Sequence, residues 1–161
     1  MGFLDGVFKK KDLEIGSPAK GKCVSIKTVP DPTFSEEILG KGVAVEPSEG
    51  KFYAPADGKI STLFATKHAV GVTTAEGAEI LIHVGLDTVN LKGEHFTAHV
   101  EEGAAVKKGA LLLEADLEAI AAAGYKTITP ILICNTGDFK EVVPGEERMV
   151  SPGDSVLSIK L

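Results

Sequence analysis

Long apolar runs, cysteines and basic residues are all scarce in this sequence. No stretch approaches the roughly 20 apolar residues that span a bilayer, and no secretory signal is evident, which argues against an integral or exported protein. Cys23 and Cys134 lie far apart in strand-like segments, so we expect two reduced, buried thiols and no disulfide. The 17 basic and 23 acidic residues give a net charge of −6, which argues against a nucleic-acid partner and suits a partner with a basic surface.

The composition is otherwise that of an ordinary globular domain. A chain of 161 residues with 43% hydrophobic and 25% charged residues is expected to form one domain, which we assign to residues 12–161. Residues 1–11 form a separate tail in which four apolar side chains precede three lysines. Such a basic amphipathic segment predicts either peripheral membrane contact or a disordered tail, and the sequence favours neither.

Two pairs of similar segments indicate a duplicated β-motif. Residues 17–26 resemble residues 54–63, and residues 106–113 resemble residues 150–157. Each segment is a tight turn that leads into a short strand. Two interleaved copies of one motif would pack their sheets face to face.

We therefore predict an all-β fold, an antiparallel β-sandwich or flattened barrel built from the duplicated motif. Only two short helical stretches are expected. Asp116–Ala123 has an aspartate to cap its start and Gly124 just past its end. The second is a turn around Ser35–Leu39, which Gly40 would stop.

Two histidines lie at matched positions in a predicted β-hairpin. Strand-like segments flank the polar, glycine-containing stretch from Thr73 to Ala78. A turn centred between Ala75 and Glu76 would set His68 opposite His83. Directly opposed side chains have Cβ atoms about 4.5–5.5 Å apart, so the two imidazoles would touch.

The alternation of the second strand separates its core face from its open face. A period of two places one aliphatic row inside and the histidine outside. The predicted inner row is Ile80, Ile82, Val84 and Leu86, and the predicted outer row is Leu81, His83 and Gly85.

Each histidine also has a neighbour that can fix its ring. The Thr66 hydroxyl, two residues before His68, can reach that imidazole. The Gly85 carbonyl can accept a proton from a ring nitrogen of His83. Fixing one nitrogen sets the tautomer and leaves the other nitrogen available for chemistry.

These residues resemble the glucose-type enzyme IIA family of the bacterial sugar phosphotransferase system. Gly77–Val89 resembles its phosphorylation-site signature, and Thr66–Ala69 resembles the segment with its second histidine. Val29–Phe34 and Leu91–Phe96 also fit the family, and the resemblance extends from Leu13 to Leu161.

The resemblance implies a cytoplasmic phosphocarrier that needs no cofactor. His83 would accept a phosphoryl group from the histidine-containing carrier HPr and pass it to the IIB domain of a sugar permease, of the glucose type by default. His68, steered by Thr66, would offer a hydrogen bond or positive charge to the phosphoryl oxygens, and Gly85 would aim the His83 ring.

The resemblance also implies a docking surface around the histidines. Asp31 and Asp87 match positions where the family meets basic residues of its partners. An apolar patch would be supplied by Phe34, Phe64, Leu81 and Val89, although Phe64 and Val89 are equally consistent with core positions.

Other functions remain open at this point. A zinc-dependent hydrolase could use His68 and His83, but catalytic zinc usually takes three protein ligands and His95 and His99 are predicted at the surface. Zinc shared between the histidine pair and a partner's carboxylate is compatible with the sequence. A biotinyl- or lipoyl-type carrier would fit the Val-x-x-Gly turns but not the lack of a lysine-bearing hairpin tip. A regulatory binding role, the identity of the sugar and the oligomeric state are not readable.

Overall fold

The computed structural model describes residues 12–161, so the predicted tail, with its proposed membrane contact, lies outside the described residues. Within them, no helix combines the length and hydropathy that crossing a bilayer requires. The strands are β1 Leu13–Gly16, β2 Gly21–Ser25, β3 Lys41–Pro47, β4 Lys51–Tyr53, β5 Gly58–Leu63, β6 Ala69–Thr73, β7 Glu79–His83, β8 Phe96–Ala98, β9 Ala105–Val106, β10 Leu111–Ala115, β11 Thr129–Ile133, β12 Glu141–Pro144, β13 Arg148–Val150 and β14 Ser155–Lys160. The helices are α2 Pro32–Ser35 and α3 Leu117–Ala122, with 3-10 turns η1 Ile26–Thr28, η2 Thr88–Leu91 and η3 Thr136–Asp138.

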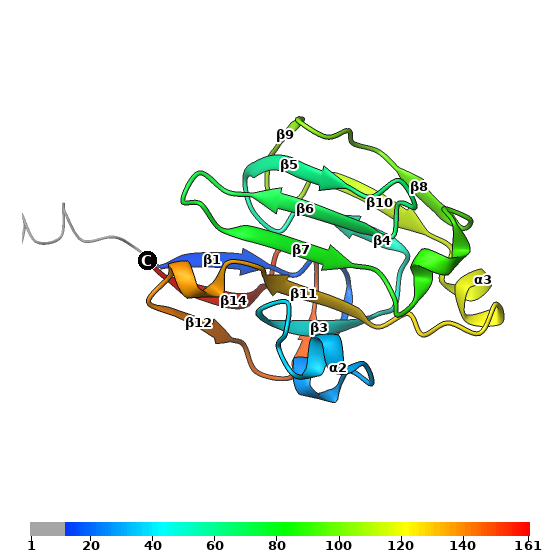
Figure 1. Ribbon diagram of the computed structural model, residues 1–161, viewed down its shortest axis with the longest axis horizontal. Coiled ribbons are helices and arrows are strands. Elements are labelled where there is room, and N and C mark those ends of the chain that lie inside the picture. Colours follow the sequence, from blue (N-terminus) through cyan, green and yellow to red (C-terminus); the bar gives the residue numbers. More distant parts are fainter. Residues whose placement is uncertain (1–11) are drawn as a thin grey trace, which may run out of the picture.

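The strands form three antiparallel sheets in a sandwich-like arrangement. The large sheet has the order β13-β2-β3-β11-β7-β6-β5-β9, and the two small sheets have the orders β1-β14-β12 and β4-β10-β8. In Figure 1 the central strands β5, β6, β7 and β11 run side by side. The predicted all-β fold is confirmed, as a sandwich whose sheets do not close into a barrel.

The large sheet repeats the same strand pattern from both of its edges. In one half β13 pairs with β2, with Val150 opposite Gly21, and in the other half β9 pairs with β5, with Val106 opposite Gly58. The chain then continues from β13 into β14 and from β9 into β10, each the middle strand of a small sheet. The two repeated segments found in the sequence are therefore equivalent strands of two interleaved halves.

The two halves are also joined to each other by matched backbone hydrogen bonds. The Gly16 N–H donates to the Pro55 carbonyl over 2.8 Å, and the Tyr53 N–H donates to the Pro18 carbonyl over 2.7 Å. Gly16 and Pro18 hold the positions in one half that Tyr53 and Pro55 hold in the other. Each half thus completes the hydrogen bonding of its counterpart.

The inner face of the large sheet forms the main core. Ile80, Ile82 and Val84 are buried there, as the alternation of β7 predicts. Leu86 is also buried, but it belongs to a second cluster on the other face of the sheet, so its predicted place in the inner row is wrong. The cause is the left-handed conformation of Gly85 (φ 79°), which ends the alternation of the strand.

The second cluster lies under the segment that contains η1 and α2. It joins Phe34 of α2 and Ile26 of η1 to Ala44 of β3 and Leu132 of β11, with Leu81 at its border. In Figure 1 α2 lies beside β3. This segment therefore covers the outer face over β3 and β11 and reaches the neighbouring side chains of β7.

One helix prediction is confirmed and the other is displaced. The Asp116 side chain accepts the Ala119 N–H at the start of α3, and Gly124 (φ 95°) follows its end. The turn expected around Ser35–Leu39 instead begins as α2 at Pro32. Asp31 caps that helix by accepting the Thr33 N–H, and a proline suits the first helical position.

The cysteine prediction is half correct. Neither thiol is in a disulfide, and Cys23 is buried in β2, but Cys134 is exposed just after β11. The alternation of β11 continues one residue past the strand, which turns Cys134 to the open side. Partial burial and the nearby Glu79 carboxylate raise the pKa of the Cys134 thiol.

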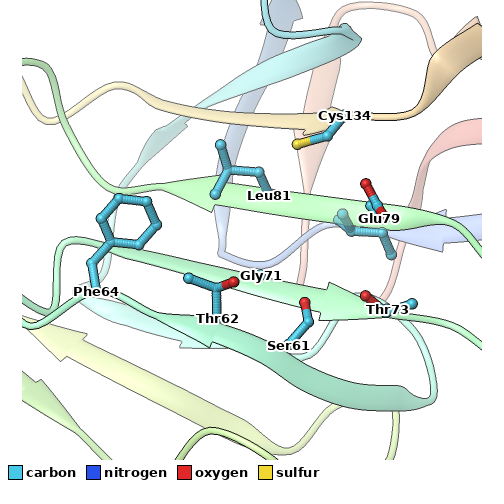
Figure 2. Close-up of a pocket in the computed structure, with 9 residues that line it drawn as sticks. Ser61, Thr62, Phe64, Gly71, Thr73, Glu79, Leu81 and Cys134 are labelled. Atoms are coloured by element: carbon cyan, nitrogen blue, oxygen red, sulfur yellow. The ribbon is translucent and has the colours of Figure 1, made fainter.

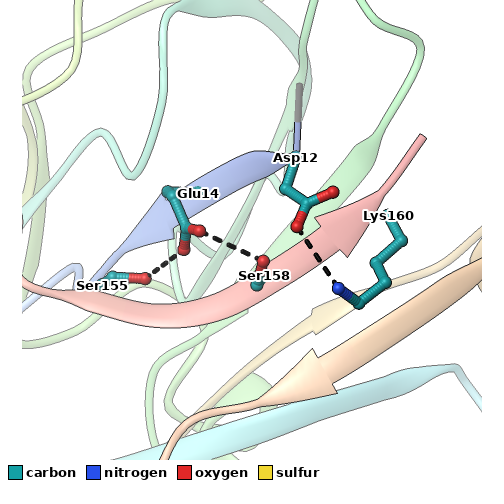
Figure 3. A network of polar contacts seen from close by, with 5 residues as sticks. All are labelled: Asp12, Glu14, Ser155, Ser158 and Lys160. Atoms are coloured by element: carbon teal, nitrogen blue, oxygen red, sulfur yellow. Dashed lines mark hydrogen bonds and ion pairs between the residues drawn. The ribbon is translucent and has the colours of Figure 1, made fainter. Parts of the chain in front are cut away.

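The first and last strands of the described chain are fastened together by polar side chains (Figure 3). Glu14 of β1 accepts hydrogen bonds from the Ser155 and Ser158 hydroxyls of β14. The Lys160 ammonium lies 3.3 Å from the Asp12 carboxylate. These exposed contacts supplement the backbone pairing of β1 with β14.

Candidate functional site

The β6–β7 hairpin has a register one residue away from the predicted one. Ala69, not His68, lies opposite His83. The Thr74 N–H bonds to the Ala78 carbonyl over 3.0 Å, so the loop is centred on Glu76. An odd number of loop residues was not anticipated, and it shifts every predicted pair by one.

The two histidine rings nevertheless meet, because His68 lies outside the regular strand. Lys67 adopts a left-handed conformation (φ 58°) that turns the chain just before β6. The Val84 N–H then donates to the His68 carbonyl over 2.7 Å. The ring centroids of His68 and His83 lie 4.9 Å apart at 84°, an edge-to-face contact.

His83 is fixed by a backbone carbonyl. Its Nδ1 lies 2.7 Å from the Gly85 oxygen. A carbonyl oxygen can only accept a hydrogen bond, so Nδ1 must carry the proton in the neutral ring. The lone pair of the neutral His83 imidazole is therefore at Nε2.

His68 is fixed by a hydroxyl group instead. Its Nδ1 lies 2.6 Å from the Thr66 Oγ1, and the residue is only 2% exposed. A hydroxyl can donate as well as accept, so the Thr66 O–H can donate to Nδ1 of His68, which leaves the ring proton on Nε2. His68 can then act as a hydrogen-bond donor while His83 presents a lone pair.

Both rings are held neutral by their surroundings. Burial lowers the pKa of His68 to about 4, with a further contribution from the adjacent His83. Burial also lowers the pKa of His83, against the opposing effects of the Gly85 carbonyl and of the Asp31 and Asp87 carboxylates. Near neutral pH the pair is therefore uncharged, which suits a nucleophile.

Two phenylalanines flank the histidine pair. Phe34 of α2 lies 5.0 Å from the His83 ring, and Phe64 lies 5.4 Å from the His68 ring, both measured between centroids. Phe34 is buried, whereas Phe64 is 41% exposed and Val89 is 47% exposed. The question left open for Phe64 and Val89 is thus decided: both are surface residues.

A groove of about 350 Å³ runs along the open face beside the histidines. Its lining includes Phe64 and Leu81, neighbours of the pair, and Glu79 and Cys134 further along β7 and β11. Figure 2 shows Phe64 and Glu79 at opposite ends of this groove. Asp31 is partly buried at the cap of α2 and Asp87 is exposed after β7, and both carboxylates are near enough to His83 to favour its charged form.

The zinc interpretation gains no third ligand. Among residues 12–161, no group of three or more histidine, cysteine, aspartate or glutamate side chains is arranged to hold a metal. His95 and His99 are exposed, as predicted, and His99 Nε2 lies 3.0 Å from the Glu114 carboxylate.

The residues that support the site from behind were not predicted from the sequence. Thr88 is fully buried, and its hydroxyl donates to the Val84 carbonyl over 2.6 Å. The Lys126 carbonyl accepts the Leu86 N–H over 3.0 Å. A polar residue shortly after a glycine at a strand end was the available signal for Thr88. No sequence signal indicated Lys126, which acts through its backbone.

A family model, a curated relative and a solved structure all point to one family. Residues 13–139 match the family model of the phosphoenolpyruvate-dependent sugar phosphotransferase system, EIIA 1. The PTS system glucose-specific EIIA component of Oceanobacillus iheyensis is 43% identical over 145 residues, which cover 90% of this chain and 88% of that protein. Among solved structures, glucose permease IIA from Mycoplasma capricolum matches with a TM-score of 0.87 and 37% identity, over 92% of this chain and 96% of that one.

Several other relatives are much longer than this chain. The PTS system beta-glucoside-specific EIIBCA component of Bacillus subtilis is 46% identical over 145 residues, which cover 90% of this chain and 24% of that protein. The glucosamine-specific EIICBA component of the same organism is 54% identical over 121 residues, which cover 75% of this chain and 19% of the relative. The chain therefore spans about a quarter or less of these relatives, whose names combine EIIA with EIIB and EIIC components.

Proposed function

Because the chain belongs to the EIIA 1 family of the sugar phosphotransferase system, whose members are phosphocarriers, we propose that His83 is the residue that carries the phosphoryl group. The supporting observation is the His83 ring itself, with Nδ1 bound to the Gly85 carbonyl and the Nε2 lone pair available. The donor is a phosphohistidine of HPr, and the acceptor is a cysteine of a permease IIB domain. Both are cytoplasmic partners, acting on the single domain that we assign to residues 12–161.

The forward step exchanges one phosphorus–nitrogen bond for another. The Nε2 lone pair of His83 forms the new bond, and the donor ring takes back the electron pair of the bond that breaks. A donor ring protonated at its other nitrogen then leaves as neutral imidazole. The phosphorylated His83 ring keeps its proton on Nδ1 and continues to donate it to the Gly85 carbonyl. This hydrogen bond stabilises the positive charge that the ring acquires.

The onward step uses the same geometry. A thiolate of the IIB cysteine supplies the electron pair for the new phosphorus–sulfur bond, and Nε2 of His83 recovers its lone pair. His68, with Nδ1 paired to Thr66, offers its Nε2–H to the phosphoryl oxygens as their charge redistributes. Because its pKa is near 4, His68 acts first as a neutral donor, and the phosphoryl dianion favours its protonation.

The partners are proposed to dock over the open face beside the pair. Phe64, Leu81 and Val89 supply apolar contact area and exclude water, while Asp31 and Asp87 attract basic residues. The relatives that unite EIIA with EIIB and EIIC components support a permease as the acceptor. Their names include beta-glucosides, glucosamine and glucose, so we propose a glucose-type sugar as the default substrate class.

Labelled phosphoenolpyruvate, supplied with the general donor proteins, tests the proposal. The wild-type chain and His99→Ala, a control that removes an exposed histidine, should both acquire label, and His83→Ala should acquire none. Persistent label in His83→Ala, or none in the wild type, would overturn the assignment.

Zinc shared with a partner's carboxylate is a separate proposal. Zinc should tighten the binding of that partner to the wild-type chain but not to a His68→Ala variant.

A further inference from the structure

The corner that follows β7 is unusually constrained. Gly85 has φ 79°, and a Cβ atom at that position would lie 2.6 Å from the Thr88 methyl carbon and 2.8 Å from the Lys126 carbonyl oxygen. Only glycine fits a corner that is both left-handed and this closely approached. The Thr88 side chain is thus in direct contact with the residue whose carbonyl orients His83.

The same threonine fixes the backbone of Val84, the residue that joins His83 to the His68 segment. The Val84 N–H donates to the His68 carbonyl over 2.7 Å, and the Val84 carbonyl accepts the Thr88 hydroxyl over 2.6 Å. The next carbonyl along the chain, that of Gly85, accepts Nδ1–H of His83. One short stretch of backbone, residues 83–85, therefore carries the His83 ring and bonds to the backbone of His68, and Thr88 holds it from the buried side.

From this arrangement we infer that Thr88 is a positioning residue for phosphoryl transfer, which acts by aiming the Gly85 carbonyl at His83. The inference rests on the proposed function for its catalytic consequence, but not for its structural one. Without the hydroxyl, the Val84 carbonyl loses its side-chain partner, and the bond from the Leu86 N–H to the Lys126 carbonyl is left to hold the peptide that carries the Gly85 oxygen. A displaced Gly85 oxygen accepts less well from Nδ1 of His83, which weakens the preference of the ring proton for that nitrogen.

The other half of the sheet contains a matched threonine without a histidine. Thr136, after β11, donates its hydroxyl to the Ile133 carbonyl over 2.7 Å and accepts the Lys41 N–H over 3.0 Å. Ile133 ends β11 as His83 ends β7. Thr136→Val therefore removes a hydroxyl bond from a strand end, together with the acceptor of the Lys41 N–H, and reports the structural cost of such a loss away from the histidines.

Nitrogen-15 NMR of the histidine rings, with no donor present, tests the inference. Wild type, Thr88→Ser and Thr136→Val should hold His83 almost wholly as the Nδ1–H tautomer. Thr88→Val should give a mixture with the Nε2–H tautomer, and its rate of phosphoryl acceptance should fall about 10-fold, the lower end for a residue that orients a ligand. Thr88→Ser should retain most of that rate because it keeps the hydroxyl.

An unchanged His83 tautomer in folded Thr88→Val, or an equal change in Thr136→Val, would overturn the inference. If Thr88→Val does not fold, Thr88→Ala removes the hydroxyl without adding bulk and is held to the same criterion. The tautomer measurement needs no phosphoryl group. A tautomer shift in Thr88→Val would therefore support the positioning role even if the wild type accepted no label, and that absence of label in the wild type would refute the proposed function alone.

Discussion

The two halves of the large sheet share a framework and differ at the ends of their central strands. His83 ends β7 and lies opposite Ala69, while Ile133 ends β11 and lies opposite Lys41. Past the strand, one half turns through Gly85, whereas the other turns through Asn135, whose side chain bonds to the Gly77 carbonyl and the Glu79 N–H. The two halves share their strands, and the proposed chemistry depends on a few residues at one strand end.

The halves also differ in what covers their outer face. The segment with η1 and α2 packs on Ala44 and Leu132 in one half, and its Phe34 ring reaches across to His83. The groove leaves the other half open beside Phe64 and Leu81. Duplication alone would give two equivalent faces, so the covering segment is what makes one of them accessible and supplies a wall for the site.

The largest expected effect is a loss of phosphoryl acceptance at the end of β7 and a loss of stability at the end of β11. His83→Ala should abolish phosphoryl acceptance with a small change in unfolding free energy, because the side chain is only partly buried. Ile133→Ala should leave acceptance by folded protein near the wild-type rate but destabilise the fold by about 2–5 kcal/mol, since it empties a fully buried site. Labelling assays and urea unfolding measure the two; a stable, inactive Ile133→Ala would contradict the comparison.

The next effect concerns the partner ring. His68→Gln should still accept a phosphoryl group on His83 but should transfer it about 100-fold more slowly, because the oxygens lose a positioned donor. Single-turnover transfer to a IIB domain is the measurement. Thr66→Val should behave in the same direction, since it removes the hydroxyl that sets the His68 tautomer. Wild-type transfer rates in both variants would exclude His68 from the mechanism.

Folding stability should depend on pH through His68. Its pKa falls from 6.5 to about 4 on folding, so the unfolded chain binds more protons between these values. Stability is therefore complete above pH 6.5 and decreases as the pH falls toward 4, by about 3 kcal/mol at most from this residue. Urea unfolding of wild type and His68→Gln at pH 7.5 and 4.5 isolates the contribution; equal losses in both proteins would refute it.

The smallest effect concerns the acidic residues around the site. Asp31→Asn and Asp87→Asn should each lower the pKa of His83 further, because both carboxylates favour its charged form. Asparagine still caps α2 at position 31 and tolerates the left-handed backbone at position 87 (φ 59°). The same variants should weaken HPr binding, with less dependence on salt. NMR titration and binding assays at two salt concentrations test both, with Glu118→Gln on α3 as the charge control.

The sequence predicted the contact between the two histidines better than the backbone geometry around them. Alternation in β7 was enough to assign Ile80 and Ile82 to the core and His83 to the other face, because a strand buried on one side permits only one phase. The ring partners Thr66 and Gly85 followed from their short separation along the chain. Local patterns of this kind survive folding largely unchanged.

The errors arose where distant segments decide the geometry. The hairpin register depended on whether its loop has an odd or even number of residues, which composition does not reveal. Leu86 was assigned to the wrong face because Gly85 adopts a left-handed conformation that breaks the strand alternation. Thr88 and Lys126, which lie further along the chain, pack closely against Gly85. Phe34, next to His83, comes from a helix displaced from its predicted position by the Asp31 cap.

The interleaving of the halves has a consequence for how the protein reaches its native state. β14 follows every other strand along the chain, yet it is the central member of the sheet that contains β1. Strands that await partners more than a hundred residues away close large loops, so folding should be slow and concerted. On a ribosome, the histidine hairpin can form early, but the scaffold that holds it becomes complete only when β14 has emerged.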